Sequence, residues 1–261
     1  MNEIFTNALL MKKLFFLLIL VVLGEIVMGQ ETKVLSRYER QKINSIDASG
    51  AFKIRVQEGE ATKATVTIPA RLEKNLVFTL NEYGKLKLGF EGSVTFRKGE
   101  ECTADIVCSS LQNVYLSGAT DLNALGDYRG SVVTFKLSGA SKGKFEGMMK
   151  AKEMELEMSG ASKLVVNAEV EKAEIELSGA SALLLTGKAQ TSEVEVSGAA
   201  KGDLGQFQVE DVNVEVSGAS KLILSVTKGL KGKVSGASKV VYSGDIHPEV
   251  RVSGAAAIKK N

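Results

Sequence analysis

The sequence predicts an all-β protein whose larger part, residues 111–261, is a right-handed parallel β-helix-like solenoid, with an N-terminal β-region that caps or accompanies it. Three observations support this fold class. The tripeptide Ser-Gly-Ala recurs at short and nearly constant intervals, the residues before it alternate between apolar and polar, and the chain combines 26 Gly with only two Pro. Short repeats of this kind indicate a stacked repeat fold, and many Gly with few Pro indicate tight turns in a regular backbone.

The repeats define about eight coils, with successive copies 18 to 21 residues apart. The residue directly before each serine is apolar in every copy, and the residue before that one is charged or a tyrosine. The third residue before the serine is apolar except at Gly232. This alternation is typical of a strand with one buried face. The copies begin at Ser117, Ser138, Ser159, Ser178, Ser197, Ser217, Ser235 and Ser253.

A second short strand follows the tripeptide in most copies, as at residues 163–166. One such unit cannot bury its own apolar face, whereas stacked units can, and each strand then pairs with its equivalent in the next coil. Parallel crossovers favour a right-handed coil. The constant Gly fits a corner with positive φ, and the constant Ala predicts a corner too tight for a larger side chain. A propeller fits less well, because each blade needs about 40 residues.

Residues 30–110 carry a different pattern. Short alternating runs at residues 64–68 and 85–88 predict strands, and residues 81–84 predict a hairpin turn. One further Ser-Gly-Ala copy begins at Ser49, well apart from the others in the chain. We expect this region to cover the first coil of the solenoid, because an open sheet edge invites aggregation.

Residues 1–29 have the features of a cleaved signal peptide. A short basic start precedes an apolar run, residues 14–23, which suits a signal peptide but is too short to span a membrane. We expect cleavage after Gly29, translation from Met1 or Met11, and no lipid anchor, because no Cys follows the run. The mature protein is therefore expected in the periplasm, at the cell surface or outside the cell, with no stable membrane span.

The two cysteines, Cys102 and Cys108, lie six residues apart in one predicted strand. Six strand residues span roughly 20 Å, whereas the Cα atoms of a bridged pair are about 6 Å apart. We therefore predict two unpaired and mostly buried thiols.

Two segments resemble a known family. The first is Ile-Asp-Ala-Ser-Gly-Ala-Phe-Lys-Ile-Arg-Val at residues 46–56. The second is Ser-Ser-Leu-Gln-Asn-Val-Tyr-Leu-Ser-Gly-Ala at residues 109–119, which the Ser-Gly-Ala-Ser-Lys copies follow. Together they are similar to the family called the putative auto-transporter adhesin head GIN domain, over residues 45–255. The resemblance implies an exported all-β solenoid, found mostly in Bacteroidetes-type bacteria, with no known active site.

The residues needed for common catalytic chemistry are scarce. A formal net charge of +2 provides no broad basic field for nucleic acid, and one His with two Cys excludes metal centres built on these residues. The sequence Gly-Ala-Ser-Lys-Gly at residues 139–143 matches a nucleophile elbow, but that motif needs a strand-to-helix turn and a histidine base. The only histidine is His247. We predict no catalytic residues, no cofactor and no nucleic-acid partner.

Stacking would place equivalent residues of successive coils in columns. One acidic column is a candidate Ca²⁺ site, with a solvated face as the alternative, and a second acidic column (Glu155, Glu174 and Glu193) lies beside it. A basic column just after the corner is a candidate contact surface for an anionic glycan or a protein, with a role in solubility as the alternative. The members of the first acidic column are Glu157, Glu176, Glu195 and Glu215, and those of the basic column are Lys142, Lys163, Lys201, Lys221 and Lys239.

These features predict a non-catalytic, adhesion-like or structural module of the cell envelope that contacts a glycan or an envelope or surface protein through one solenoid face. A regular repeated face suits an extended or repeated ligand. Two alternatives stay open: a carbohydrate-active enzyme on a β-helix, and a structural protein that associates with itself as a homo-oligomer.

Overall fold

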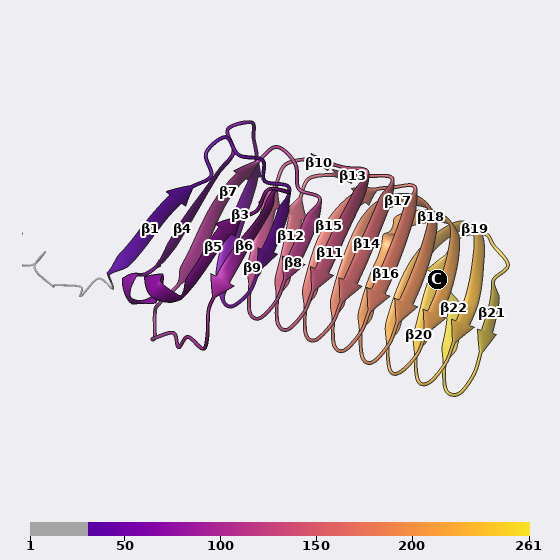
Figure 1. The fold of residues 1–261 in the computed structure, drawn as a ribbon. Helices are drawn as coiled ribbons and strands as arrows, with labels where there is room; N and C mark the ends of the chain where they lie inside the picture. Colours follow the sequence, from indigo (N-terminus) through magenta and orange to yellow (C-terminus); the bar gives the residue numbers. More distant parts are fainter. Residues whose placement is uncertain (1–30) are drawn as a thin grey trace, which may run out of the picture. The chain divides into compact units, whose positions relative to one another are not determined.

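The computed structural model describes residues 31–261, and the apolar and polar alternation of the sequence becomes a stack of β-coils (Figure 1). The expected all-β parallel solenoid is confirmed, with about seven turns. Each coil has two strand-forming sides that meet at a Ser-Gly-Ala corner. Figure 1 shows these corners as a row of narrow turns along the lower edge of the stack.

The A side consists of the strands that lead into the corners. Their inward residues are apolar and their outward residues are mostly charged, as in β14, where Met154, Leu156 and Met158 are buried between exposed glutamates. Neighbouring strands are parallel and in register. The A side contains β2 (Ser45–Ala48), β8 (Asn113–Leu116), β11 (Val132–Leu137), β14 (Glu153–Met158), β16 (Lys172–Leu177), the second parts of β17 (Ala182–Val196), β18 (Lys201–Val216) and β19 (Lys221–Val234), and β21 (Glu249–Val252).

The B side consists of the strands that leave the corners, and it is parallel and in register as well. In the first coils the two short strands β10 (Tyr128–Arg129) and β13 (Met149–Lys150) lie between a B strand and the next A strand, whereas β17, β18 and β19 run through both sides without a break. The B side contains β3 (Phe52–Glu58), β9 (Asp121–Leu125), β12 (Lys142–Glu146), β15 (Lys163–Glu169), the first parts of β17, β18 and β19, β20 (Lys239–Ser243) and β22 (Ala257–Lys260).

The corners are held by a repeated backbone hydrogen bond. The N–H of each corner Ala donates to the carbonyl oxygen of the Gly one coil earlier, as from Ala180 to Gly160 at 2.7 Å. The corner glycines have positive φ, +66° at Gly179, and a Cβ there would lie 2.7 Å from the oxygen of Gly160. The corner alanines are exposed instead. The tight fit that we expected at Ala is therefore at Gly, whose backbone lies directly on the glycine of the previous coil.

The N-terminal region extends the same ladder. Strand β6 (Lys85–Phe90) pairs in parallel with β2, and β7 (Cys102–Cys108) pairs in parallel with β3. Strands β5 (Leu76–Leu80) and β4 (Lys63–Pro69) then add antiparallel to β6 and β7, and β1 (Thr32–Arg37) pairs with β4. A 3₁₀ helix, η1 (Ala70–Asn75), joins β4 to β5. The predicted hairpin is confirmed between β5 and β6, where the Oδ1 atom of Asn81 accepts hydrogen bonds from the backbone N–H groups of Tyr83 and Lys85.

The Ser-Gly-Ala copy at Ser49 lies at the corner between β2 and β3, directly beside the corner at Ser117. The strands on both sides of residue 110 thus share one sheet. A division into separate regions at residues 110 and 111 stays a prediction.

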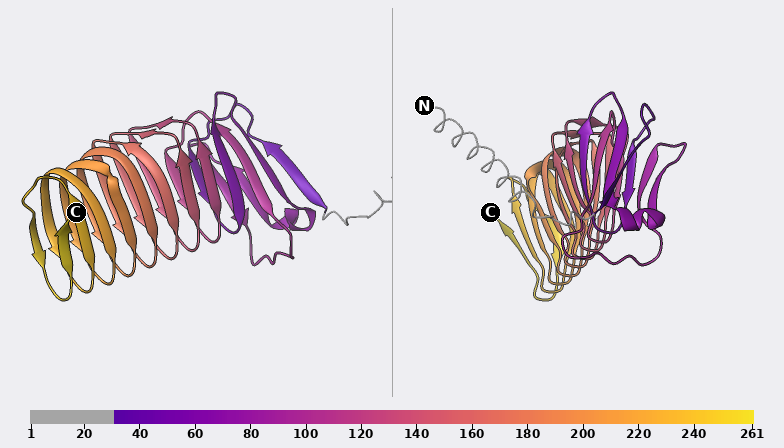
Figure 2. Two further views of the ribbon diagram at one scale, coloured as in Figure 1. Left: turned by 180° about the vertical axis from the view of Figure 1, so that it is seen from behind. Right: turned by 90° about the vertical axis from the view of Figure 1, so that its left-hand side faces the viewer.

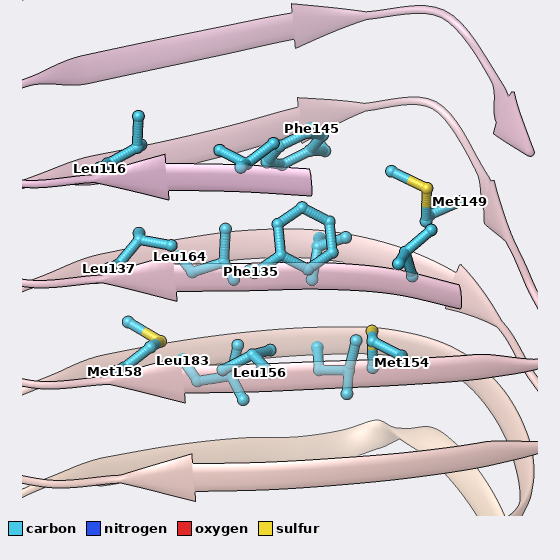
Figure 3. Packing of buried hydrophobic residues seen from close by; sticks show 14 of the residues in the cluster. Leu116, Phe135, Leu137, Phe145, Met149, Met154, Leu156, Met158, Leu164 and Leu183 are labelled. Atoms are coloured by element: carbon cyan, nitrogen blue, oxygen red, sulfur yellow. The ribbon is translucent and has the colours of Figure 1, made fainter. Parts of the chain in front are cut away.

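The core fills the space between the A and B sides, and Figure 2 shows the coils lying one behind another when the stack is viewed along its length. Most of its side chains are aliphatic. An aromatic pair crosses the core between the two sides, with the rings of Phe135 and Phe145 at 4.9 Å and 72° (Figure 3). Beside Phe145, Gly143 leaves room for Leu164, because a Cβ on this glycine would lie 2.9 Å from the leucine side chain.

Cys102 and Cys108 are free and buried in β7, which confirms the predicted thiols. Burial raises the pKa of Cys102 to about 11 and that of Cys108 to about 12. The predicted signal peptide, its cleavage after Gly29 and the choice of start codon lie outside the described residues. No helix among residues 31–261 has the length and apolar character needed to cross a membrane.

Candidate binding surfaces

A groove of about 640 Å³ runs along the A side next to the corners. Its lining repeats from coil to coil, because each coil contributes the outward residue two positions before the corner and the corner serine itself. We call it the corner groove. The outward residues are Tyr115, Lys136, Glu157, Glu176, Glu195 and Glu215, and the corner serines run from Ser117 to Ser217.

Three glutamates of the corner groove carry unpaired charge. Glu176, Glu195 and Glu215 occupy neighbouring rungs in register, so their Cα atoms are about 4.8 Å apart. All three are exposed, and within the described chain none of them forms an ion pair. Stacked carboxylates at this spacing repel one another unless a cation or a hydrogen-bond donor lies between them. The corner groove is therefore suited to a ligand that supplies such groups.

The N-terminal end of the corner groove has a different character. The Lys136 Nζ atom lies 2.7 Å from a Glu157 carboxylate oxygen, and this hydrogen bond raises the pKa of Lys136. Further along, the ammonium group of Lys85 lies 3.0 Å from Asp47 and 4.5 Å from the centre of the Tyr115 ring. The corner groove is thus acidic from Glu176 to Glu215, whereas its N-terminal end contains ion pairs and the ring of Tyr115.

Sequence reasoning did not place Tyr115 or Asp47 in a site. Tyr115 occupies the same position before the corner as the glutamates, and Asp47 has that position in the Ser49 copy. The positional signal was therefore present. The two residues come together because β2 stacks on β8, where Asp47 is the register partner of Tyr115.

The second acidic column lies farther from the corner and is mostly neutralised. The Lys172 Nζ atom lies 2.5 Å from Glu174 and 3.7 Å from Glu193, and the hydrogen bond with Glu174 raises the pKa of Lys172. In residues 31–261 no three His, Cys, Asp or Glu side chains converge as metal ligands. The glutamates Glu157, Glu176, Glu195 and Glu215 form a line, and a Ca²⁺ site on them stays a prediction.

The hydroxyl groups at the fourth corner position point into the coil. Ser220 and Ser238 donate to the carbonyl oxygens of their own corners, Ser217 at 2.7 Å and Ser235 at 2.6 Å. Ser141 is fully buried and its hydroxyl bonds to the Leu116 carbonyl oxygen at 3.4 Å. The serine of the elbow-like Gly-Ala-Ser-Lys-Gly sequence thus lies inside a corner, without the exposure that a nucleophile needs.

The basic column lies on the B side, where its lysines are register partners on adjacent parallel strands. Its members, Lys142, Lys163, Lys201, Lys221 and Lys239, are all exposed. The structure thus brings the five predicted lysines into one row, interrupted by Ala182 between Lys163 and Lys201. The two sides pack their inward faces together, as the contact between Phe135 and Phe145 shows, so this row and the corner groove face away from each other.

A parallel solenoid with an extended groove and regular charged columns defines a repeat protein of the class that presents long binding surfaces. The chain belongs to the family described as putative auto-transporter adhesin, head GIN domain, whose model matches residues 43–245. No curated protein matches this chain.

Solved structures of bacterial proteins share the fold. A putative adhesin from Parabacteroides merdae is 17% identical, with a TM-score of 0.81, and the match covers 89% of this chain and 97% of the other. A putative lipid binding protein from Parabacteroides distasonis is 15% identical, with a TM-score of 0.80 and coverage of 89% and 98%. A putative adhesin from the same species is 16% identical, with a TM-score of 0.75 and coverage of 89% and 98%.

Proposed function

We propose that this protein is an exported, non-catalytic, adhesin-like module that binds a linear, hydroxyl-rich glycan along the corner groove. The observation that carries the proposal is the repeated lining of the corner groove, which offers a carboxylate and a serine hydroxyl at successive rungs. Carboxylates accept hydrogen bonds from hydroxyl groups, and serine hydroxyls both donate and accept them. A ligand with regularly spaced hydroxyl groups finds equivalent partners in coil after coil.

The aromatic end of the corner groove supports a glycan as the ligand. Tyr115 presents a half-buried ring with the Lys85 ammonium group 4.5 Å from its centre, and a ring of this kind offers an apolar surface next to a polar tip. Membership of an adhesin family supports a binding role. The buried position of Ser141 argues against a serine nucleophile in the elbow-like sequence.

Binding to an array of linear polysaccharides, followed by calorimetry on the best ligand, tests the proposal. We expect Glu176→Gln/Glu195→Gln/Glu215→Gln and, separately, Tyr115→Ala to weaken glycan binding at least tenfold. The matched control is Lys172→Gln/Glu174→Gln, an ion pair of the same face outside the corner groove, which we expect to bind as the wild type does. If no glycan binds, or if the groove variants bind as well as the control, the proposal is wrong.

A further inference from the structure

The B side carries a row of lysines, the basic column, whose ammonium groups form no ion pair within residues 31–261. Most other lysines of the A side and the coil ends pair with acids, as Lys172 does with Glu174 and Lys228 with Glu210. Within the described chain, the lysines of the basic column form no such pair. Side chains of like charge one rung apart repel each other. An anionic partner is the occupant that relieves this repulsion.

A second row on the B side is aliphatic. It lies two residues beyond the lysine row, a distance of roughly 7 Å along each strand. Val165 and Leu184 are neighbours in register, and each is 38% exposed. Ile223 and Val241 continue the row as partly exposed neighbours, after an interruption at Asp203. Outward strand positions of a solvated sheet are normally polar, so this row is unusual for a face that meets only water.

We propose that the B side lies flat on an anionic lipid surface. The lysine ammonium groups contact headgroup phosphates, and the aliphatic row reaches into the headgroup boundary between them. Basic side chains are attracted to anionic leaflets, and aliphatic side chains beside them add burial at the interface. The long stems of the lysines allow the charged ends to stay among the headgroups while the sheet approaches closely.

The aliphatic row distinguishes a lipid surface from a soluble anionic polymer. A hydrophilic polyanion would neutralise the lysines but would gain nothing from Val165 and Leu184. The charges of the A side point to the same orientation, because Glu176, Glu195 and Glu215 face away from the lysines and are repelled by an anionic surface. The protein would therefore lie with its corner groove directed away from the lipid. This inference stands on the B side alone and does not depend on what the corner groove binds.

Flotation with vesicles tests the inference on the purified protein at low salt. The probes are vesicles of phosphatidylcholine alone and vesicles of phosphatidylcholine and phosphatidylglycerol in equal amounts. We expect binding to the anionic vesicles only. Lys201→Gln/Lys221→Gln/Lys239→Gln should lower the apparent affinity about a hundredfold, because each basic residue near an anionic surface contributes about a fivefold factor. Val165→Ser/Leu184→Ser should lower it severalfold.

The matched control is Lys172→Gln/Lys228→Gln/Lys231→Gln, which removes the same net charge from lysines that are ion-paired elsewhere. We expect this variant to bind anionic vesicles nearly as the wild type does, and circular dichroism to show that all variants are folded. Equal weakening by both triple variants would overturn the inference, because net charge would then explain the binding. Absence of binding to anionic vesicles would also overturn it. A third result would overturn it as well: Val165→Ser/Leu184→Ser binds vesicles as the wild type does, and the protein binds soluble polyphosphate as tightly as vesicles. This result would identify a hydrophilic polyanion as the occupant.

Discussion

The backbone N–H of Ala119 donates to the carbonyl oxygen of Gly50 at 2.6 Å, so the corner that begins at Ser49 is the first rung of the same ladder. The intervening chain forms the N-terminal strands and then returns to the stack at β8. These strands also protect the ladder, because β6 and β7 pair with the open edges of β2 and β3. An inserted segment of the chain thus covers the beginning of the solenoid, as a capping element must.

The first prediction concerns the corner glycines. Gly92→Ala and Gly179→Ala both place a side chain at a similar positive φ, +69° and +66°. At Gly92 the new Cβ meets no atom of the described part of the chain within 4 Å, but at Gly179 it meets the Gly160 oxygen at 2.7 Å. We expect Gly92→Ala to cost about 1 kcal/mol from backbone strain. Gly179→Ala should cost more than about 3 kcal/mol, because overpacking is added to the strain.

Urea unfolding followed by circular dichroism measures both values. Gly92→Ala is the control for the conformational cost alone. Similar losses in the two variants would show that the glycine-on-glycine stacking of the corners contributes nothing beyond a positive φ.

The solenoid and its buried positions could be predicted because every coil repeats the same short pattern. Alignment on the serine identifies the inward Leu116 and the outward Glu157 without any structure. The beginning of the ladder could not be predicted, because the contact between Ala119 and Gly50 bridges a long inserted segment that has no repeat of its own. The aromatic end of the corner groove was missed for the same reason, since Asp47 approaches Tyr115 only through this contact.

The second prediction concerns the inward hydroxyl groups. Among residues 31–261, the Ser181 hydroxyl is buried without a hydrogen-bond partner, whereas the Ser220 hydroxyl donates to its own corner at 2.7 Å. The next coil has Ala200 in place of Ser181, so alanine fits this position. We expect Ser181→Ala to be neutral or to stabilise the fold by up to about 1 kcal/mol, and Ser220→Ala to cost about 1 kcal/mol. Thermal unfolding of the two variants compares them directly, and equal destabilisation would contradict the assigned bonding.

The third prediction concerns the two thiols. Because burial raises the pKa of Cys102 to about 11 and of Cys108 to about 12, both are protonated at pH 8, and the thiolate is the reactive form. We expect no reaction of the native protein with a disulfide reagent at pH 8, and the release of two thiols per chain after denaturation. An added thiol in the exposed hairpin turn, Glu82→Cys, is the positive control and should react at once. Rapid reaction of the native thiols, or a protein mass that reveals a disulfide, would contradict the structure.

The fourth prediction concerns acid stability at the N-terminal strands. The Arg71 guanidinium binds both carboxylate oxygens of Glu100, and the Arg97 N–H donates to the same carboxylate at 2.8 Å. The hydrogen bond from Arg71 lowers the pKa of Glu100 from 4.5 to about 2. The carboxylate therefore stabilises the folded state above pH 4.5, and this contribution is lost as the pH falls from about 4.5 towards about 2.

We expect Glu100→Gln to lower the unfolding temperature at pH 7, and the difference from the wild type to shrink below pH 4.5 and to vanish near pH 2. Calorimetric scans across this range measure the difference. The control is Glu101→Gln, because the neighbouring pair of Glu101 with Lys53 is exposed and an exposed pair contributes little. The Arg71 contact also joins η1 to the chain before β7, since the same guanidinium donates to the Thr95 carbonyl oxygen at 2.6 Å. A difference between Glu100→Gln and the wild type that stayed constant down to pH 2 would show that the side chain acts through packing alone, because only the carboxylate loses its charge over this range.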